Sequence, residues 1–266
     1  QGQNARGEQL VKLRPSELDK EGLRSTSFTD LTFSADKSIS LAYEVALKEN
    51  PRLAAKIAEA FQGSVKDALD YIESEYMYSR TDELAQPKML SAVYFHHESR
   101  KDNDGFISPH LHAHALAMSI TQDVTGKYRK MENYNICTDH KHIGLVQRAA
   151  LAKRLQEVGV EIEVYDAKKA FIQIKGFKQE HREIFSGRHE MVQAAKEELK
   201  KLYPNMKDSK LEEMAKVQTR NWKDKTIDRE AIRDENIERA HGFGYELPKL
   251  NETSVLKQTM TPNQIL

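Results

Sequence analysis

The stretch Ser108-Pro-His-Leu-His-Ala-His-Ala-Leu-Ala-Met-Ser-Ile120 carries three histidines at alternate positions among small apolar residues. Successive side chains of a β-strand point to opposite faces, so a strand here turns His110, His112 and His114 to one side and the alanines to the other. Two imidazoles on one strand face can hold a metal ion, and imidazole suits Zn, Mn, Fe, Ni or Cu. The stretch therefore predicts a strand with a metal-binding face and a face on which a helix packs closely.

A third ligand is available in the preceding apolar segment, Met89 to Phe95, which is followed by His96 and His97. A polar, turn-like segment separates it from the first stretch, so we expect the two to form an antiparallel hairpin. On that hairpin either His96 or His97 faces the two histidines of the other strand. The alternative is that the histidines form an ordinary polar surface. Against it, half of the chain's 10 histidines gather on this one hairpin.

Composition narrows the class of protein. The 266 residues include 41 Lys and Arg and 41 Asp and Glu, so a nucleic-acid partner requires a local basic patch rather than an overall positive charge. Cys137 is the only cysteine, which excludes an intramolecular disulfide and fits a reducing compartment. No apolar run reaches the roughly 18 residues of a membrane span. The first residues resemble neither a signal peptide nor a Met start, so we expect the chain to begin inside a longer protein.

Hydrophobic periodicity predicts an α+β chain. Alternation over 26–35 predicts a strand with Leu31 and Phe33 inward, and Ser34 or Asp36 can cap the helix that follows. We expect a core over about 22–178 and a charged helical lobe over about 179–266 of a single domain, residues 1–266. Within these parts we expect helices over 37–47, 51–78 and 139–158, strands over 160–164 and 170–174, and helices over 179–185, 187–202, 207–219 and 226–240.

Three segments occur in a fixed order: Asp30-Leu-Thr-Phe-Ser-Ala-Asp-Lys-Ser-Ile-Ser-Leu41, His97-Glu-Ser-Arg100 and Pro109-His-Leu-His-Ala-His114. This series resembles the motifs of conjugative relaxases of the MobF type, members of the HUH endonuclease superfamily. The segments 144–159 and 218–220 are similar to the same family, and the similarity extends over about 22–245. The resemblance implies a central antiparallel sheet of HUH (palm) type flanked by helices, with a helical C-terminal lobe that closes over single-stranded DNA.

The resemblance also implies an activity. Such enzymes nick one strand at a plasmid transfer origin through a phosphotyrosyl link and rejoin it, and a divalent ion (Mg, Mn or Zn) held by three histidines polarises the phosphate. Position by position, His97, His112 and His114 match the metal ligands, and His97 is preferred to His96 because Ser99-Arg100 follows it. Asp30 matches an acidic residue that orients a ligand histidine and helps to deprotonate the tyrosine.

Partners follow from the same resemblance. We expect a cytoplasmic bacterial monomer, without membrane insertion, that binds single-stranded origin DNA, relaxosome proteins and the coupling protein of a type IV secretion system. His110 stands where the family more often has glutamine and is expected beside the ligands or at the DNA. The basic residues proposed for contacts to the DNA backbone are Lys37, Arg148, Arg220 and Lys223.

The chain departs from the family pattern at two positions. Asp36 stands where proline is usual, which a turn tolerates. The family's attacking tyrosines precede the Asp30 motif, whereas the first tyrosine here is Tyr43, at a packing position; we therefore expect the nucleophile upstream of Gln1. Two alternatives stay open: a non-catalytic module that binds single-stranded DNA, and a metal-dependent hydrolase that uses water on a small phosphodiester.

Overall fold

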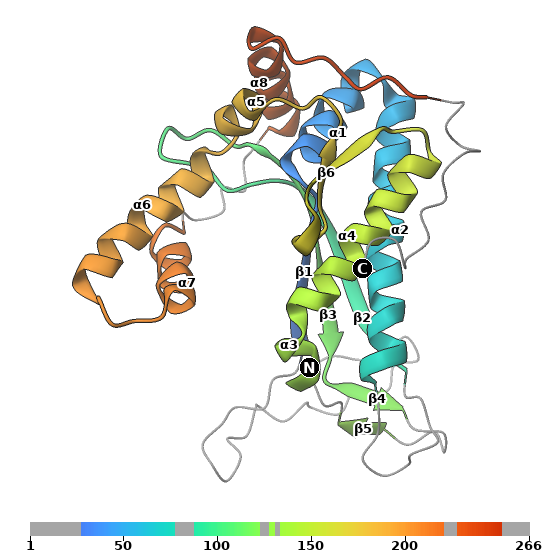
Figure 1. Ribbon diagram of the computed structural model, residues 1–266, viewed down its shortest axis with the longest axis vertical. Coiled ribbons are helices and arrows are strands. Elements are labelled where there is room, and N and C mark those ends of the chain that lie inside the picture. The colour runs from blue at the N-terminus through green and yellow to red at the C-terminus, as the bar shows by residue number, and fades with distance from the viewer. Residues whose placement is uncertain (1–27, 78–87, 123–127, 131–133, 221–227, 252–266) are drawn as a thin grey trace, which may run out of the picture.

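A computed structural model describes residues 28–77, 88–122, 128–130, 134–220 and 228–251. At its centre lies a three-stranded antiparallel sheet in the order β1 (Phe28–Ser34), β3 (Pro109–Met118), β2 (Ser91–Glu98) (Figure 1). The expected hairpin of the two histidine-bearing segments is therefore confirmed, and its second strand is the middle strand of the sheet.

Helices cover the face of the sheet opposite the histidines of β3. They are α1 (Lys37–Glu49), α2 (Pro51–Tyr76) and α4 (His140–Glu157), with the short α3 (Tyr134–Thr138) before α4. Figure 1 shows α2 and α4 side by side along the sheet. Ala113, Ala115 and Ala117 of β3 are fully buried beneath these helices, because only small side chains let a helix approach a strand closely.

Local signals explain where these helices begin. Asp36 caps α1, since its carboxylate accepts a hydrogen bond from the backbone N–H of Ser38 at 2.8 Å. Asn50 caps α2 by accepting from the N–H of Leu53 at 3.1 Å, and Pro51 takes the first helical position, where no N–H is needed. After α4 the chain turns at Gly159, whose φ of +86° favours glycine.

Two small hairpins flank the central sheet. The strands β4 (Ile120–Gln122) and β5 (Tyr128–Lys130) form one of them. The other consists of β6 (Ile162–Asp166) and β7 (Phe171–Ile174), joined by a 3₁₀ turn, Ala167–Lys169. The second pair was expected from alternating residues over 160–164 and 170–174, and the tip of the first hairpin lies outside the described residues.

The four C-terminal helices lie close to the expected ranges but divide into two groups. α5 (Gln179–Ile184) and α8 (Arg229–Gly242) lie beside α1, and a second hydrophobic cluster joins this region to the core through Leu41, Val45, Phe106, Phe177, Phe185, Ala240 and Tyr245. α6 (Gly187–Leu202) and α7 (Asp208–Gln218) pack on each other around a small cluster of their own and project from the core (Figure 1). A domain boundary near residue 178 stays a prediction.

No helix within the described ranges is both long enough and apolar enough to cross a lipid bilayer.

Candidate metal centre

The register of the sheet decides which side chains share the face that carries the histidines. Residues directly opposite each other in an antiparallel pair point to the same side. One row across the three strands consists of Ser34, His112 and His96, and the next consists of Thr32, His114 and Tyr94.

Three imidazoles meet on this face. The ring centroids of His96 and His112 are 5.3 Å apart, those of His112 and His114 are 5.3 Å apart, and those of His96 and His114 are 5.6 Å apart. The rings thus form a nearly equilateral triangle contributed by β2 and β3. His110 stacks on His112 at 4.6 Å and extends the cluster toward the start of β3.

His97, the expected third ligand, points to the other side of the sheet. Its ring packs edge-on against Tyr43 of α1, with centroids 5.0 Å apart. The cause is the alternation of the strand, because His96 is the direct partner of His112 and the next residue faces the helices. The structure therefore brings His96, not His97, to His112 and His114. Tyr43 is 7% exposed, which agrees with the packing position expected for it.

Hydrogen bonds at Nδ1 leave two of these imidazoles with a free lone pair on Nε2, the atom that could bind a metal ion. His114 Nδ1 lies 3.0 Å from both carboxylate oxygens of Asp30, and His112 Nδ1 lies 2.8 Å from the carbonyl oxygen of His110. A carbonyl oxygen only accepts, so Nδ1 of His112 carries its proton and Nε2 keeps a lone pair; an ionised Asp30 imposes the same on His114. This is the arrangement that orients histidine ligands of metal ions. Asp30 thus contacts His114, one of the candidate ligands, and the metal-binding role of that histidine stays a prediction.

Burial keeps part of the cluster neutral. It lowers the pKa of His112, and it lowers the pKa of His110 to about 3, where His112 and Lys37 add to the effect. Neutral imidazole is the form that binds metal ions, so proton competition at His112 is weak near neutral pH.

The triangle fits a metal ion closely but is slightly wide. With metal–nitrogen bonds of about 2.1 Å, three imidazoles around one ion place their ring centroids about 5 Å apart. In the part of the chain that the structure describes, no three His, Cys, Asp or Glu side chains already stand at metal-binding distances. Binding of one ion would require the ring nitrogens of His96, His112 and His114 to converge, and the donor chemistry suits a divalent ion.

The start of α1 anchors the histidine strand. Lys37 Nζ donates to the carbonyl oxygen of Pro109 at 2.8 Å, and Ser40 Oγ accepts from the N–H of Leu111 at 3.0 Å. Burial lowers the pKa of Lys37 to about 8. The position of Lys37 thus gives no support to the DNA contact expected for it. Instead, the motif at 37–40 holds the beginning of β3 in place.

Asp36, where the family pattern has proline, has a second role besides capping. Its carboxylate accepts two hydrogen bonds from the guanidinium of Arg182 at 2.8 and 3.1 Å, and one from the Tyr165 hydroxyl at 3.2 Å. Arg182 lies in turn over the Tyr165 ring, 5.2 Å from its centroid. This group ties α5 and β6 to the start of α1, beside the residues that anchor β3.

Comparison with models of protein families shows to which family this chain belongs. The family model described as TrwC relaxase matches residues 1–243. The chain belongs to the TrwC relaxase family. The match confirms the resemblance to MobF-type relaxases and, with the sheet and helices above, the expected α+β fold.

Solved TrwC structures resemble the chain over most of its length. A metal-free complex of the conjugative relaxase TrwC with oriT DNA is 27% identical, with a TM-score of 0.70 over 85% of this chain and 77% of that one. TrwC complexed with a 27-mer DNA comprising the recognition hairpin and the cleavage site is 26% identical, with a TM-score of 0.71. That match covers 91% of this chain and 82% of the TrwC chain. A metal-bound complex of TrwC with oriT DNA is 26% identical, with a TM-score of 0.71, and the match covers 86% of this chain and 76% of that one. A comparison with curated proteins finds no match.

The basic residues expected to contact DNA in this TrwC-family chain lie in different settings. Arg148 of α4 is half-buried, donates through Nε to the carbonyl oxygen of Lys169 at 2.8 Å and covers the Phe171 ring at 4.9 Å. Arg220 is exposed just after α7. Lys223 lies outside the described residues. The three that the structure describes, Lys37, Arg148 and Arg220, therefore do not form one exposed basic patch.

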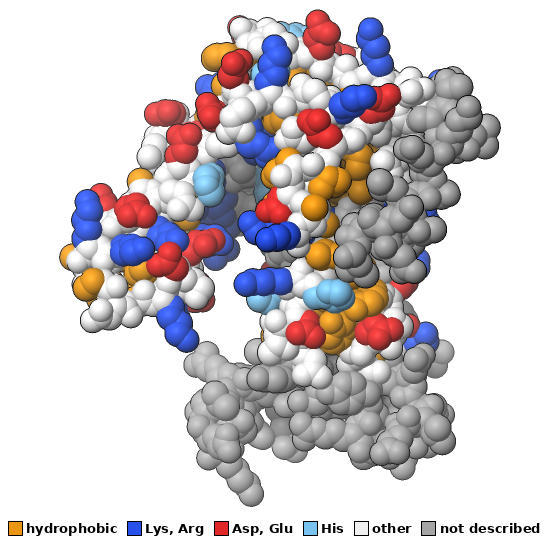
Figure 2. All heavy atoms as spheres, viewed as in Figure 1, with side chains coloured by type: hydrophobic (Ala, Val, Ile, Leu, Met, Phe, Trp, Pro, Cys, Tyr) orange, Lys and Arg blue, Asp and Glu red, His pale blue; other side chains and the backbone are white. Residues whose placement is uncertain are grey.

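A group of arginines that sequence reasoning missed lies at the base of the α6–α7 hairpin. Arg188 donates to the carbonyl oxygen of Thr219 at 2.8 Å, which places it beside Arg220. Burial and the charge of Arg220 lower the pKa of Arg100, and burial and the charge of Arg100 lower the pKa of Arg188. Three guanidinium groups from separate segments are thus close enough to repel one another. Figure 2 shows Lys and Arg side chains on both sides of the hollow between this hairpin and the core.

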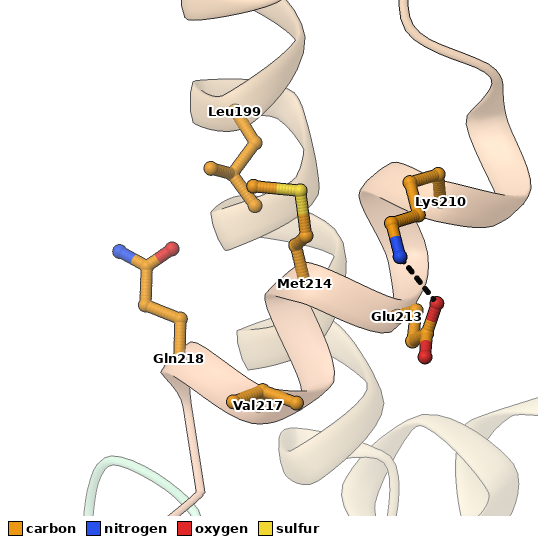
Figure 3. A pocket seen from close by; sticks show the side chains of 6 residues that line it. All are labelled: Leu199, Lys210, Glu213, Met214, Val217 and Gln218. Carbon is orange, nitrogen blue, oxygen red and sulfur yellow. Dashed lines mark hydrogen bonds and ion pairs between the residues drawn. The ribbon is translucent and has the colours of Figure 1, made fainter. Parts of the chain in front are cut away.

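A separate groove of about 350 Å³ lies on the α6–α7 hairpin, between Leu199 of α6 and Met214 and Val217 of α7 (Figure 3). Lys210 and Glu213 form an ion pair of 3.3 Å at its edge. It shares no residue with the histidine cluster.

Proposed function

We propose that this chain performs the DNA-processing step of conjugative transfer, a metal-dependent nicking and rejoining of one strand at a transfer origin. The observation that carries the proposal is the triangle of His96, His112 and His114, with Asp30 on the outer nitrogen of His114. Family membership and the complexes of TrwC with oriT DNA support the same substrate. In this proposal the third histidine ligand is His96 instead of His97.

The reaction proposed is a transesterification. A tyrosine hydroxyl gives up its proton to a base, a step in which the resemblance gives Asp30 a part, and its oxygen attacks the scissile phosphorus. The bond from phosphorus to O3′ breaks as the phosphotyrosyl bond forms, and O3′ takes up a proton, so that no net proton is gained or lost. Rejoining is the reverse. A divalent ion, when bound, would offset negative charge that develops on the phosphate oxygens. His96, His112 and His114 would hold it, and Asp30 would keep the His114 ring in its donor orientation.

Local positive charge supports single-stranded DNA as the ligand. The chain has no net charge, so attraction for a phosphate backbone must come from clusters such as Arg100, Arg188 and Arg220. In cells the proposal places the chain in the bacterial cytoplasm with relaxosome proteins and the coupling protein of the secretion system.

The experiment incubates two forms, the chain itself and a form extended upstream of Gln1, with single-stranded origin oligonucleotides and Mg²⁺, Mn²⁺ or Zn²⁺. Cleavage is read on denaturing gels and covalent adducts by intact and peptide mass spectrometry, which also identifies the attacking tyrosine. We expect metal-dependent cleavage by the extended form, because the attacking tyrosine is expected before Gln1. This cleavage should be lost in His112→Ala and His114→Ala and kept in His189→Ala, a control at an exposed histidine of α6.

Other outcomes separate the alternatives. Oligonucleotide binding without cleavage or an adduct in either form would identify a non-catalytic single-stranded DNA-binding module. Turnover of a generic diester without an adduct would identify a hydrolase that uses water. Unchanged cleavage in both His112→Ala and His114→Ala would contradict the proposed site.

A further inference from the structure

Tyr94 occupies a position on the histidine face that neither the motifs nor the comparisons single out. It lies in β2 two residues before His96, and its direct partner on β3 is His114. Its ring therefore stands on the same side of the sheet as the three imidazoles. Along a strand, two residues span about 6.6 Å, which is close to the length of one nucleotide.

The Tyr94 side chain is unusually open. It is 54% exposed, and across the described ranges it has neither a ring contact nor a hydrogen bond. Its neighbours on this face other than His96 and His114 are Ala92 on its own strand and Thr32 at the other end of its row, and both are too small to cover the ring. By contrast, Tyr43 is buried against His97, and Tyr165 stacks on Phe171 and donates to Asp36.

An exposed aromatic residue by itself is ordinary. Here the position makes the difference, because a strand whose scissile phosphate meets His96, His112 and His114 must place a neighbouring base over this part of the sheet. Aromatic rings bind single-stranded nucleic acids by stacking on bases, and this binding tolerates many sequences because every base has a flat face. The two rows that carry the histidines otherwise contain only Ser34 and Thr32, so Tyr94 has the one large aromatic ring in these rows besides the imidazoles.

We propose that Tyr94 is the stacking platform for an unpaired nucleobase adjacent to the scissile phosphate. The inference rests on the proposed function and adds a specific positioning residue to it. The ring supplies the contact and the hydroxyl is not required. Tyr94 therefore holds the strand in register with the histidine cluster without taking part in bond making or bond breaking.

The test compares Tyr94→Leu with Tyr94→Phe, using single-stranded oligonucleotides that carry 2-aminopurine at successive positions around the nick site. Loss of one base–aromatic stack lowers affinity about 5- to 150-fold, so Tyr94→Leu should weaken binding by that factor. Tyr94→Phe should bind as the wild type does. The slope of affinity against salt concentration should be the same in all three proteins, because no charge is removed.

Tyr203→Leu is the matched control, since Tyr203 is also exposed (45%) but follows α6 on the projecting hairpin. It should bind normally. The 2-aminopurine scan should find one position whose fluorescence is quenched by the wild type and by Tyr94→Phe but not by Tyr94→Leu. This readout depends on stacking and would not respond to a general loss of stability.

Three results would overturn the inference. The first is equal affinity of Tyr94→Leu and the wild type, and the second is a quenching pattern that does not depend on the ring. The third is loss of cleavage with normal binding in Tyr94→Phe, which would give the hydroxyl a chemical role. If Tyr94→Leu fails to fold, Tyr94→Val takes its place in the scan, because it also removes the ring and suits an exposed strand position. Failure of the wild type to bind any single strand would overturn the proposed function itself, whereas normal wild-type binding with no effect at Tyr94 would overturn only this inference.

Discussion

Replacing His96 and His97 separately tests which neighbouring imidazole binds the metal ion. The His96 ring lies 5.3 and 5.6 Å from the other two rings of the triangle, whereas His97 packs on Tyr43 across the sheet. Removing a residue that merely orients a metal ligand costs 10- to 100-fold in affinity, so loss of a ligand itself should cost more than about 100-fold, or about 3 kcal/mol. His96→Ala should therefore abolish tight binding of Mn²⁺ or Zn²⁺.

His97→Ala should have the opposite profile. Metal affinity should stay within about threefold of the wild type, while the free energy of unfolding should fall by roughly 1–2 kcal/mol, because an aromatic contact and some packing are lost. Isothermal titration calorimetry at neutral pH gives the metal affinity, and urea unfolding of the metal-free protein gives the stability. Equal loss of metal affinity in the two variants, or tight binding by His96→Ala, would refute the assignment from strand register.

Two further substitutions test the surroundings of the site. Asp30→Asn should weaken metal binding about 10- to 100-fold, because an amide is a poorer acceptor for the His114 ring; an unchanged titration would contradict that role. Burial raises the pKa of Glu44 from 4.5 to about 7, although Arg233 opposes the shift. The folded state then binds an extra proton between about pH 4.5 and 7, so this contribution to stability is complete at low pH and is lost as the pH rises through 7. Between pH 4.5 and 8, urea unfolding should show stability falling about 3 kcal/mol more in the wild type than in Glu44→Gln, and parallel profiles would exclude the effect.

Hydrophobic periodicity identified the main helices and strands, because the buried side chains of both recur every few residues along the chain. Alternating histidines and alanines in β3 predicted one polar and one buried face, and the alanines are indeed buried. Start signals such as Asp36 and Pro51 placed the helix ends within a few residues. Alternation within a strand and the start signals of a helix depend only on residues that are close in sequence, so they can be read without the tertiary structure.

The choice between His96 and His97 required the register of β2 on β3. A shift of one residue turns every side chain to the other face, and the strand is irregular between His96 and Glu98, so the motif could not decide it. Extending the alternation backwards from His96 by two residues would have pointed to Tyr94. Lys37 shows the same difficulty, since its sequence position fits a phosphate contact while its ammonium donates to Pro109.

The class of fold, the family and the strand that carries most of the clustered histidines all follow from the chain alone, because periodicity and motif order are properties of the chain. Only the tertiary structure decided which imidazoles converge, that Asp30 reaches His114 across 84 positions of sequence, and that α5 and α8 lie against α1 while α6 and α7 project. The physical reason is that strand pairing and helix packing bring distant residues within a few ångströms of each other. The position of each side chain then follows from the register of those contacts rather than from its neighbours in the chain.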